Sequence, residues 1–191
     1  MEKKKKFIFL ISLLFFCSCI QSSVTSMAGN AIISEKGFDK SVSDAFLFTK
    51  IKSNLIKLNP KNLTNVIVVV SNGKVVLIGE IDSHQTRFKI VKSIWRINGV
   101  KELHNELLIG DNYNIYQKTK DMLLSSKIKT ILLFNKEIYT NNYEIEVFND
   151  TVYLVGIARN LEEHILLEDK IKKFSGGKKL ISFVRQSKEI R

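Results

Sequence analysis

One stretch of this chain occurs twice, and the repeat constrains the fold more than any other feature. Residues 74–83 read KVVLIGEIDS, and residues 151–160 read TVYLVGIARN. The matches, each 77 positions apart, are Val75/Val152, Leu77/Leu154, Gly79/Gly156, Ser83/Asn160, Gly99/Gly176 and Leu103/Leu180. A chain that repeats itself at constant spacing is predicted to fold as two copies of one unit.

The first half of the first copy predicts a helix and a hairpin. Ser43 and Asp44 are typical of a helix start, and apolar spacing favours a helix to about Lys57. Its predicted inward residues are Phe48, Ile51, Leu55 and Leu58. Strands are predicted over 66–70 and 75–81, since Asn72-Gly73 between them suits a type I′ turn.

The second half of this copy predicts another helix and a third strand. Ser83 is expected to cap a helix that stops at Gly99, and residues 100–109 form the strand. Trp95, the only tryptophan, shares an apolar helix side with Phe88, Val91 and Ile94. We therefore expect Trp95 in the core.

The second copy repeats this order. Residues 111–124 predict its first helix, and residues 143–148 and 152–157 its hairpin, around Asn149-Asp150. Asn160 and Glu163 predict a capping box for a helix to about residue 174, and residues 180–184 form the last strand. The expected inward residues of its first helix are Ile115, Thr119, Met122 and Leu123.

The first helices of the two copies match best at a different spacing. Lys50 and Leu55 align with Lys118 and Leu123 at an offset of 68. This alignment predicts about nine extra residues in the second copy, around 125–142.

The predicted fold class is therefore α+β, with two αββαβ units. Each unit is a three-stranded mixed sheet covered on one face by two helices, with a right-handed crossover to the last strand. The units span residues 43–110 and 111–185, followed by a tail at 186–191. Because a core of about 70 residues is marginal alone, we expect the units to pack on each other.

The N-terminus predicts export. Residues 1–18 combine four lysines with a short apolar run, which is typical of a signal peptide rather than a spanning helix. Phe16-Cys17-Ser18-Cys19 resembles a bacterial lipobox. Cys19 is then the new N-terminus and carries diacylglycerol and an N-acyl chain such as palmitate, followed by a flexible tether to residue 42.

Two other ways of processing the N-terminal segment remain open. Ser26-Met27-Ala28 satisfies the small-x-small rule, so an ordinary cut would release a soluble protein that starts at Gly29. The leader could also be retained as an N-terminal anchor.

The net charge and the cysteine content limit which binding partners and which kinds of site the protein can have. The 191-residue chain has a net charge of +11, and +8 remains without residues 1–18, which hold four Lys and one Glu. Both cysteines lie at or before Cys19, so the folded part has no disulfide, cysteine-based zinc site or thiol nucleophile. In an exported protein the positive charge indicates anionic lipid, cell-wall polymer or acidic proteins rather than nucleic acid.

The repeated unit resembles the BON domain. The resemblance is carried by the VxLxG strands at 75–79 and 152–156, the helix that follows each, and the terminal GVKxL at 99–103. The second copy keeps Gly176, Lys178 and Leu180 of that last motif. Two such units after a lipobox resemble the DolP type of outer-membrane lipoprotein, whereas the OsmY type has two units and no lipid.

The resemblance implies binding to anionic phospholipid at the periplasmic face of the outer membrane, and support of outer-membrane integrity. It also implies structural glycines, Gly79 and Gly156, at the bend from strand to helix. The alternatives are an adaptor for envelope assembly proteins and a soluble, OsmY-like periplasmic stress protein.

The candidate lipid-binding residues lie on the first helix of unit two and just after it: Tyr113, Tyr116, Lys120, Lys127 and Lys129, followed by the apolar residues 131–134. Tyrosine rings suit headgroup depth, and ammonium groups meet phosphate. The alternative is that Tyr113 and Tyr116 pack against unit one, and that residues 131–134 extend the core.

No catalytic, cofactor or metal site is predicted. His84, His104 and His164 include no pair at helical i, i+4 spacing, and there is no GxSxG or phosphate-binding glycine loop. The acidic residues at 162, 163, 168 and 169 are expected on a solvated helix face.

Overall fold

The computed structural model describes residues 38–187, with side chains from residue 43 onward. The predicted signal peptide, Cys19, most of the tether and most of the tail lie outside the described residues.

Each unit has the predicted order of elements. Unit one comprises α3 (Phe38–Leu58), α4 (Asn62–Asn65), β1 (Val66–Ser71), β2 (Lys74–Ile81), α5 (His84–Trp95) and β3 (Glu102–Ile109). Unit two comprises α6 (Ile115–Leu133), the 3₁₀ helix η1 (Thr140–Asn142), β4 (Tyr143–Phe148), β5 (Thr151–Ala158), α7 (Leu161–Phe174) and β6 (Lys179–Gln186).

Both sheets have three strands with the hairpin's second strand in the centre. In unit one β2 pairs antiparallel with β1 and parallel with β3, and in unit two β5 pairs in the same way with β4 and β6. The φ angles of Asn72 and Gly73 are 53° and 76°, as a type I′ turn requires. The predicted fold class is confirmed.

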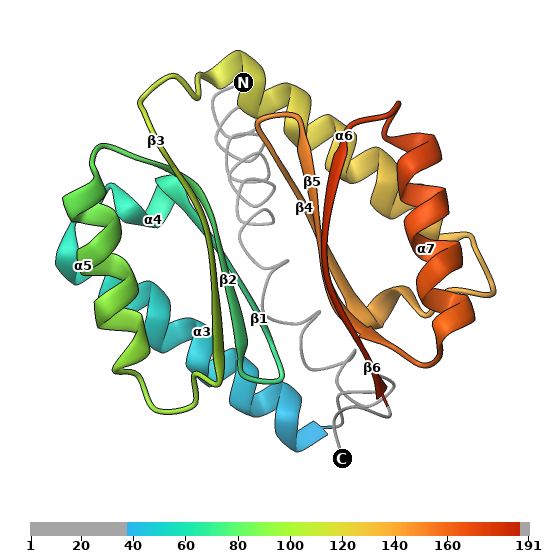
Figure 1. Cartoon of the computed structure of the whole chain (residues 1–191), viewed down its shortest axis with the longest axis horizontal. Helices are drawn as coiled ribbons and strands as arrows, with labels where there is room; N and C mark the ends of the chain where they lie inside the picture. The colour runs from blue at the N-terminus through green and yellow to red at the C-terminus, as the bar shows by residue number, and fades with distance from the viewer. Residues whose placement is uncertain (1–37, 188–191) are drawn as a thin grey trace, which may run out of the picture.

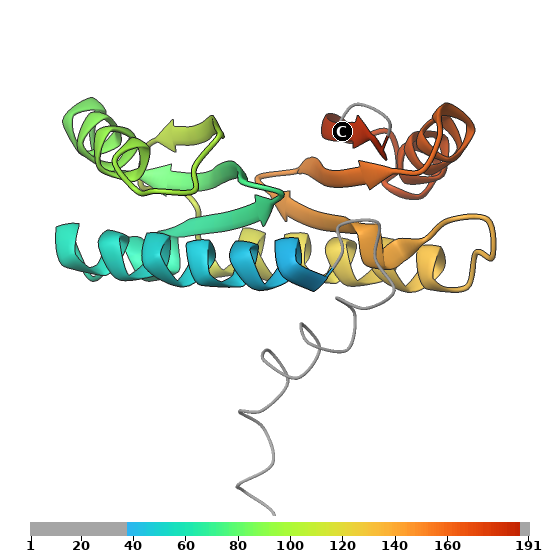
Figure 2. The same ribbon diagram turned by 90° about the horizontal axis from the view of Figure 1, so that it is seen from below.

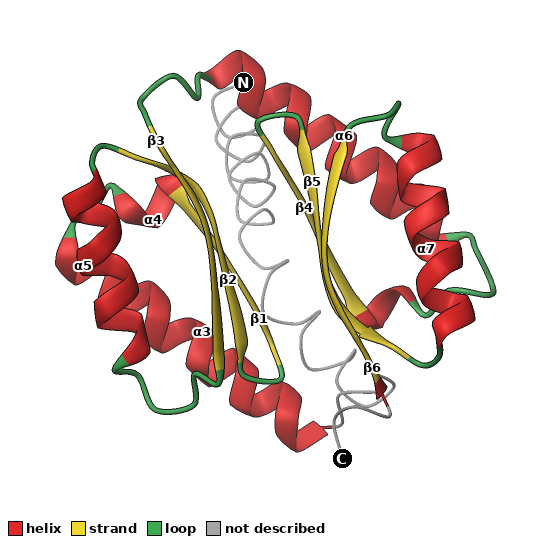
Figure 3. Cartoon of the chain, viewed as in Figure 1, coloured by secondary structure: helices red, strands yellow, loops and turns green. Residues whose placement is uncertain are grey.

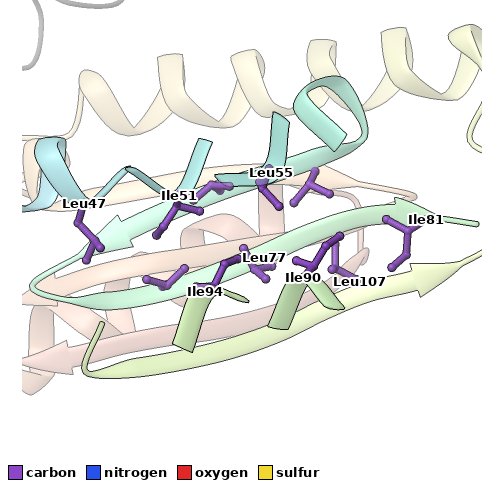
Figure 4. Close-up of a cluster of buried hydrophobic side chains, with 11 residues drawn as sticks. Leu47, Ile51, Leu55, Leu77, Ile81, Ile90, Ile94 and Leu107 are labelled. Carbon is purple, nitrogen blue, oxygen red and sulfur yellow. The ribbon is translucent and has the colours of Figure 1, made fainter. Parts of the chain in front are cut away.

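The helices cover one face of each sheet. Figure 4 shows the core of unit one, where Leu47, Ile51 and Leu55 of α3 meet Leu77 of β2 and Ile94 of α5. These side chains are at most 3% exposed. The matching core of unit two includes Ile128, Leu132, Leu154, Leu167 and Ile171.

The uncovered faces of the sheets pack against each other, as expected for two small units. Val69, Val76 and Ile78 of the first sheet form a buried cluster with Tyr153 and Val155 of the second. Helices therefore form the outer layers and strands the inner ones (Figures 1 and 3). Figure 2 shows α3 and α6 along one side of the molecule, and α5 and α7 along the other.

The first helix begins earlier than predicted, because Asp44 has another role. α3 starts at Phe38, so Ser43 and Asp44 lie inside it. The Asp44 carboxylate is buried and accepts hydrogen bonds from the backbone N–H groups of Asn72 (2.6 Å) and Gly73 (2.9 Å). It ties the helix to the hairpin turn.

Unit two repeats this contact at the same spacing as the strands. Asp121, 77 residues after Asp44, accepts from the N–H groups of Asn149 (2.6 Å) and Asp150 (3.2 Å). Ile51 and Leu55 likewise correspond to Ile128 and Leu132, all buried. The offset of 68 and the insertion around 125–142 were therefore wrong: α6 and η1 occupy the positions of α3 and α4.

The two motif glycines act in close backbone packing rather than at the predicted bend. Gly79 lies inside β2 with φ +148°, and a Cβ there would collide with the carbonyl oxygen of Asn65. Gly156 lies inside β5, where a Cβ would collide with the carbonyl oxygen of Asn142. Both glycines let the segment before the hairpin lie directly against the central strand.

Candidate functional site

The side of α6 that points away from the sheet is unusually apolar. Asn114 caps the helix by accepting from the N–H of Gln117 (3.0 Å), and Asp121, Ser125, Ile128 and Leu132 are its buried residues. Five exposed apolar residues lie on α6 away from these buried positions, and Phe134 directly follows the helix. We call these six residues the α6 outer face: Ile115 (77% exposed), Tyr116 (76%), Met122 (61%), Leu123 (63%), Leu133 (66%) and Phe134 (81%).

The rotation of α6 follows from Asp121. Its carboxylate accepts from the two turn N–H groups, from the Tyr113 hydroxyl (3.0 Å) and from the Gln117 side-chain amide (3.0 Å). A buried carboxylate needs such donors, so Asp121 must face the hairpin. The predicted inward residues Ile115, Thr119, Met122 and Leu123 are consequently exposed.

The charge of α6 is positive. The helix carries Lys118, Lys120, Lys127 and Lys129, and its one acidic residue is the buried Asp121. Lys127 is exposed, and no ion pair is found for it within residues 38–187. The α6 outer face is thus apolar, flanked by lysines and free of exposed carboxylates of its own helix.

Two of the predicted lysines have partners in unit two. The ammonium nitrogen of Lys120 lies 3.1 Å from Oδ1 of Asp150, and that of Lys129 lies 3.2 Å from Oε1 of Glu146. Hydrogen bonds from Lys178 and Lys120 hold the pKa of the Asp150 carboxyl below its usual value. Both lysines remain about half exposed and can still face an external anion.

The two predicted tyrosines lie in different environments. The Tyr113 ring packs on Phe148 with centroids 4.2 Å apart, beside the cluster between the sheets. Burial, with the nearby charge of Asp121, raises the pKa of the Tyr113 hydroxyl. Tyr113 therefore has a structural role, whereas Tyr116 belongs to the α6 outer face.

The outer side of α3 has a similar character. Phe46 is 62% exposed, with the Lys50 ammonium 4.4 Å from its ring centroid, and Ile56 is also exposed. α3 and α6 lie along the same side of the molecule (Figure 2), and both helices carry exposed apolar and basic residues.

A cleft of about 610 Å³ lies between α6 and the neighbouring parts of unit one. Ile67, Met122 and Phe148 are among its apolar lining residues, and Lys61 and Lys118 among its basic ones. Four carboxylates also line it, at Glu80, Asp82, Asp111 and Glu146. This mixture of charges gives the cleft no clear preference for an anion.

Titratable side chains elsewhere take part in local contacts. Within residues 38–187, no three His, Cys, Asp or Glu side chains come together as a metal site. His164 contacts Glu168 (3.0 Å) and Ser182 (3.4 Å) through the same nitrogen, Nε2, which is not the arrangement of a catalytic triad. Glu163, expected in solvent, is buried and accepts from the N–H of Tyr139 (2.7 Å).

Sequence reasoning missed half of the α6 outer face. Ile115, Met122 and Leu123 were assigned inward, whereas Leu133 and Phe134 belong to the apolar stretch 131–134, for which lipid binding and core packing were both considered. The signal that could have found them is the Asp44/Asp121 pair, since an offset of 77 along the whole unit assigns the outward positions correctly. Within the described residues, no helix is both long and apolar enough to cross a bilayer.

Comparison with known proteins agrees with this spacing. The pattern of the BON domain matches residues 43–111 and 120–187, two segments that begin 77 residues apart. A protein of Anaplasma centrale, "Uncharacterized protein in gshII 5'region", is 31% identical over 145 residues, 75% of this chain and 95% of that protein.

Two more distant relatives have descriptive names. "Outer membrane lipoprotein DolP" of Haemophilus influenzae is 24% identical over 184 residues, which are 93% of this chain and 93% of that protein. The "21 kDa hemolysin" of Actinobacillus pleuropneumoniae is 29% identical over 116 residues, 60% of each chain.

Proposed function

This chain belongs to the BON domain family, and from that premise we propose that it is a non-enzymatic envelope lipoprotein that binds anionic phospholipid through the α6 outer face. In this proposal Cys19 carries the lipid anchor, and the protein lies on the periplasmic side of the outer membrane. Its contact with the bilayer supports outer-membrane integrity.

The observation that carries the proposal is the composition of the α6 outer face. Six large apolar or aromatic residues are exposed along it, and lysines flank it without an exposed carboxylate on the same helix. Helices that lie in a membrane interface combine an apolar side with flanking basic residues. Each lysine close to an anionic surface adds about 1 kcal/mol of binding free energy.

The extent of this face favours a bilayer over a compact ligand. α6 has 19 residues, so the face runs for about 28 Å at 1.5 Å per residue. A small molecule would cover only part of such a length, whereas a membrane surface meets all of it. The apolar and basic residues of α3 on the same side extend the contact to unit one.

The position of α3 is compatible with the anchor. Eighteen residues separate Cys19 from Phe38, the first residue of α3. At about 3.4 Å per extended residue they reach roughly 60 Å. The domain pair can therefore lie on the membrane that holds the lipid, and a relative named as an outer-membrane lipoprotein supports that membrane as the location.

Vesicle binding by the unlipidated chain tests the proposal. We expect the protein to bind vesicles of phosphatidylglycerol and phosphatidylethanolamine but not neutral phosphatidylcholine, and to dissociate as salt rises. Lys127→Glu should weaken binding by about tenfold, because the change reverses a charge near the surface. Lys127 is suitable because it is exposed and its loss breaks no ion pair of the described residues.

Lys173→Glu is the matched control. Lys173 is exposed on α7, on the other side of the molecule, and the substitution changes the net charge by the same amount. Equal weakening by both variants would indicate a non-specific charge effect. Unchanged binding of Lys127→Glu would remove α6 as the binding surface.

A further inference from the structure

The outward side of α5 exposes two large aromatic residues that the sequence placed in the core. Phe88 is 65% exposed and Trp95 51% exposed, seven residues apart on one side of the helix. The ammonium nitrogen of Lys92 lies 5.7 Å from the centroid of the Phe88 ring. Ile90 and Ile94 alone are buried in α5, so the helix turns its aromatic residues away from its own sheet.

This surface is strongly basic. From His84 to Lys101 the sequence contains no acidic residue. Lys89 and Lys92 are exposed on the outward side of α5, and Arg96, the residue directly after the helix, is exposed as well. We refer to Phe88, Lys89, Lys92, Trp95 and Arg96 as the α5 outer face.

α7, the corresponding helix of unit two, exposes apolar residues with acidic neighbours. Leu161 is 50% exposed and Ile165 53% exposed. Glu162 and Asp169 are exposed on the same side. We refer to these four residues as the α7 outer face, and two exposed lysines, Lys172 and Lys173, follow it at the C-terminal end of the helix.

Comparison of α5 with α7 shows which positions of the two helices agree and which differ. The buried positions agree between the two helices: Ile90 and Ile94 correspond to Leu167 and Ile171. The exposed positions diverge in charge: Gln85 corresponds to Glu162, and Lys92 to Asp169. Since both helices pack on their sheets alike, packing on the sheet does not account for the opposite charges of their outer faces.

We propose that copies of this chain associate head to tail, with the α5 outer face of one copy packed against the α7 outer face of the next. α5 and α7 lie toward opposite ends of the long axis (Figure 1), so one copy can use both faces at once. A contact between two different surfaces is heterologous, and its repetition extends into a row of copies.

An antiparallel pairing of the two helices brings opposite charges together at two places. Arg96, directly after α5, meets Glu162 at the start of α7, and Lys89 meets Asp169 about two turns further on. In this register Trp95 lies against Leu161 and Ile165, all three exposed in the single copy, and Phe88 lies opposite the stretch from Asp169 to Lys172. Lys172 and Lys173 come to the N-terminal end of α5, which Asp82 precedes.

The partner of the α5 outer face is a second copy of this chain rather than another protein, because the chain itself supplies the complementary surface on α7. The contact also leaves α3 and α6 free, since they lie along the other side of the molecule (Figure 2). A row can therefore form while each copy keeps the same side toward a membrane. Two helix faces make a small contact, so confinement to a surface should be needed for extensive assembly.

The test uses the chain with residues 1–19 replaced by a histidine tag, bound to neutral phosphatidylcholine vesicles that carry a nickel-chelating lipid. Energy transfer between donor- and acceptor-labelled copies reports association. The neutral lipid makes the result independent of anionic-lipid binding, so this inference and the proposed function can fail separately.

Charge reversal provides the decisive variants. Lys89→Glu with Arg96→Glu changes the α5 outer face, and Glu162→Lys with Asp169→Lys changes the α7 outer face. We expect wild type to show transfer that rises with surface density, and each double variant alone to need about tenfold higher density. A mixture of the two should recover transfer between unlike variants, and the fourfold variant should recover assembly by itself.

Recovery in the mixture and in the fourfold variant also shows that the altered chains are folded. Absence of transfer for wild type at all densities would overturn the proposal. The proposal would also be overturned if both double variants retained energy transfer. Loss of transfer without recovery in the mixture would overturn it as well, because the α5 outer face would then bind acidic residues elsewhere.

Discussion

The phenolic oxygen of Tyr113 lies 3.0 Å from Oδ2 of Asp121. Tyr113 stands in the segment that joins the two units, and its own N–H donates to Glu80 of unit one (2.7 Å). The carboxylate that holds the second hairpin turn is therefore also bonded to the connection between the units. This bonding network fixes the rotation of α6 and with it the α6 outer face.

Asp121→Asn should destabilise the protein more than Asp44→Asn. Asp121 accepts from four donors and Asp44 from two turn N–H groups. An asparagine amide would direct its own N–H groups at these donors and leave some unpaired. We expect losses in the free energy of unfolding of about 3 kcal/mol and about 2 kcal/mol respectively, measured by urea denaturation. Equal, small losses would show that the carboxylates do not hold the turns.

Gly79→Ala should be among the most damaging single substitutions. The φ angle of +148° strains any side-chain-bearing residue, and the new Cβ would collide with the carbonyl oxygen of Asn65. We expect a loss of about 3 kcal/mol or more in the free energy of unfolding. Gly177→Ala is the control, because φ is +77° there and no atom lies within 4 Å of the added Cβ. It should lose only about 1 kcal/mol, for backbone strain alone.

Acid should weaken the contact between the units through Glu102. Partial burial opposes ionisation of its carboxyl, but Arg185 of unit two and Lys74 outweigh it and hold the pKa below the usual value. A carboxyl with a lowered folded-state pKa stabilises the protein above its unfolded-state pKa. That stability is lost as pH falls through the folded-state pKa.

Urea denaturation of wild type and Glu102→Gln across this acidic range measures the effect. The variant should be less stable than wild type at neutral pH, and the difference should shrink as the wild-type carboxyl is protonated. A difference that stays constant with pH would show that the ion pairs of Glu102 with Arg185 of unit two (3.4 Å) and with Lys74 of its own unit (3.6 Å) do not stabilise the folded protein.

The sequence predicted the strands and turns well because their signals are local. Asn72-Gly73 and Asn149-Asp150 require positive φ at both positions, and the structure has it. The caps at Ser83 and Asn160 also accept the expected N–H groups, from Thr86 (3.2 Å) and Glu163 (2.9 Å). Each of these features is decided by a few neighbouring residues.

The inward side of α6 was predicted wrongly, and so were Phe88 and Trp95 of α5, since apolar spacing alone does not identify the buried side. α6 carries apolar residues all around, and its rotation is set by the long-range bonds of Asp121 to residues 149 and 150. In α5 the exposed Phe88 and Trp95 adjoin the buried Ile90 and Ile94, so the apolar spacing fits two sides of the helix. Comparison of the two copies position by position resolves both helices.

The most direct test of membrane binding through α6 places a tryptophan on each side of the molecule in turn. Trp95 lies on α5, away from the side of α6, and Leu123→Trp with Trp95→Phe moves the only tryptophan to the α6 outer face. Vesicles of phosphatidylglycerol with brominated acyl chains quench a tryptophan that enters the bilayer. Our account predicts quenching and a blue shift for the tryptophan at position 123, and neither for native Trp95. Quenching of Trp95 without quenching at position 123 would contradict it.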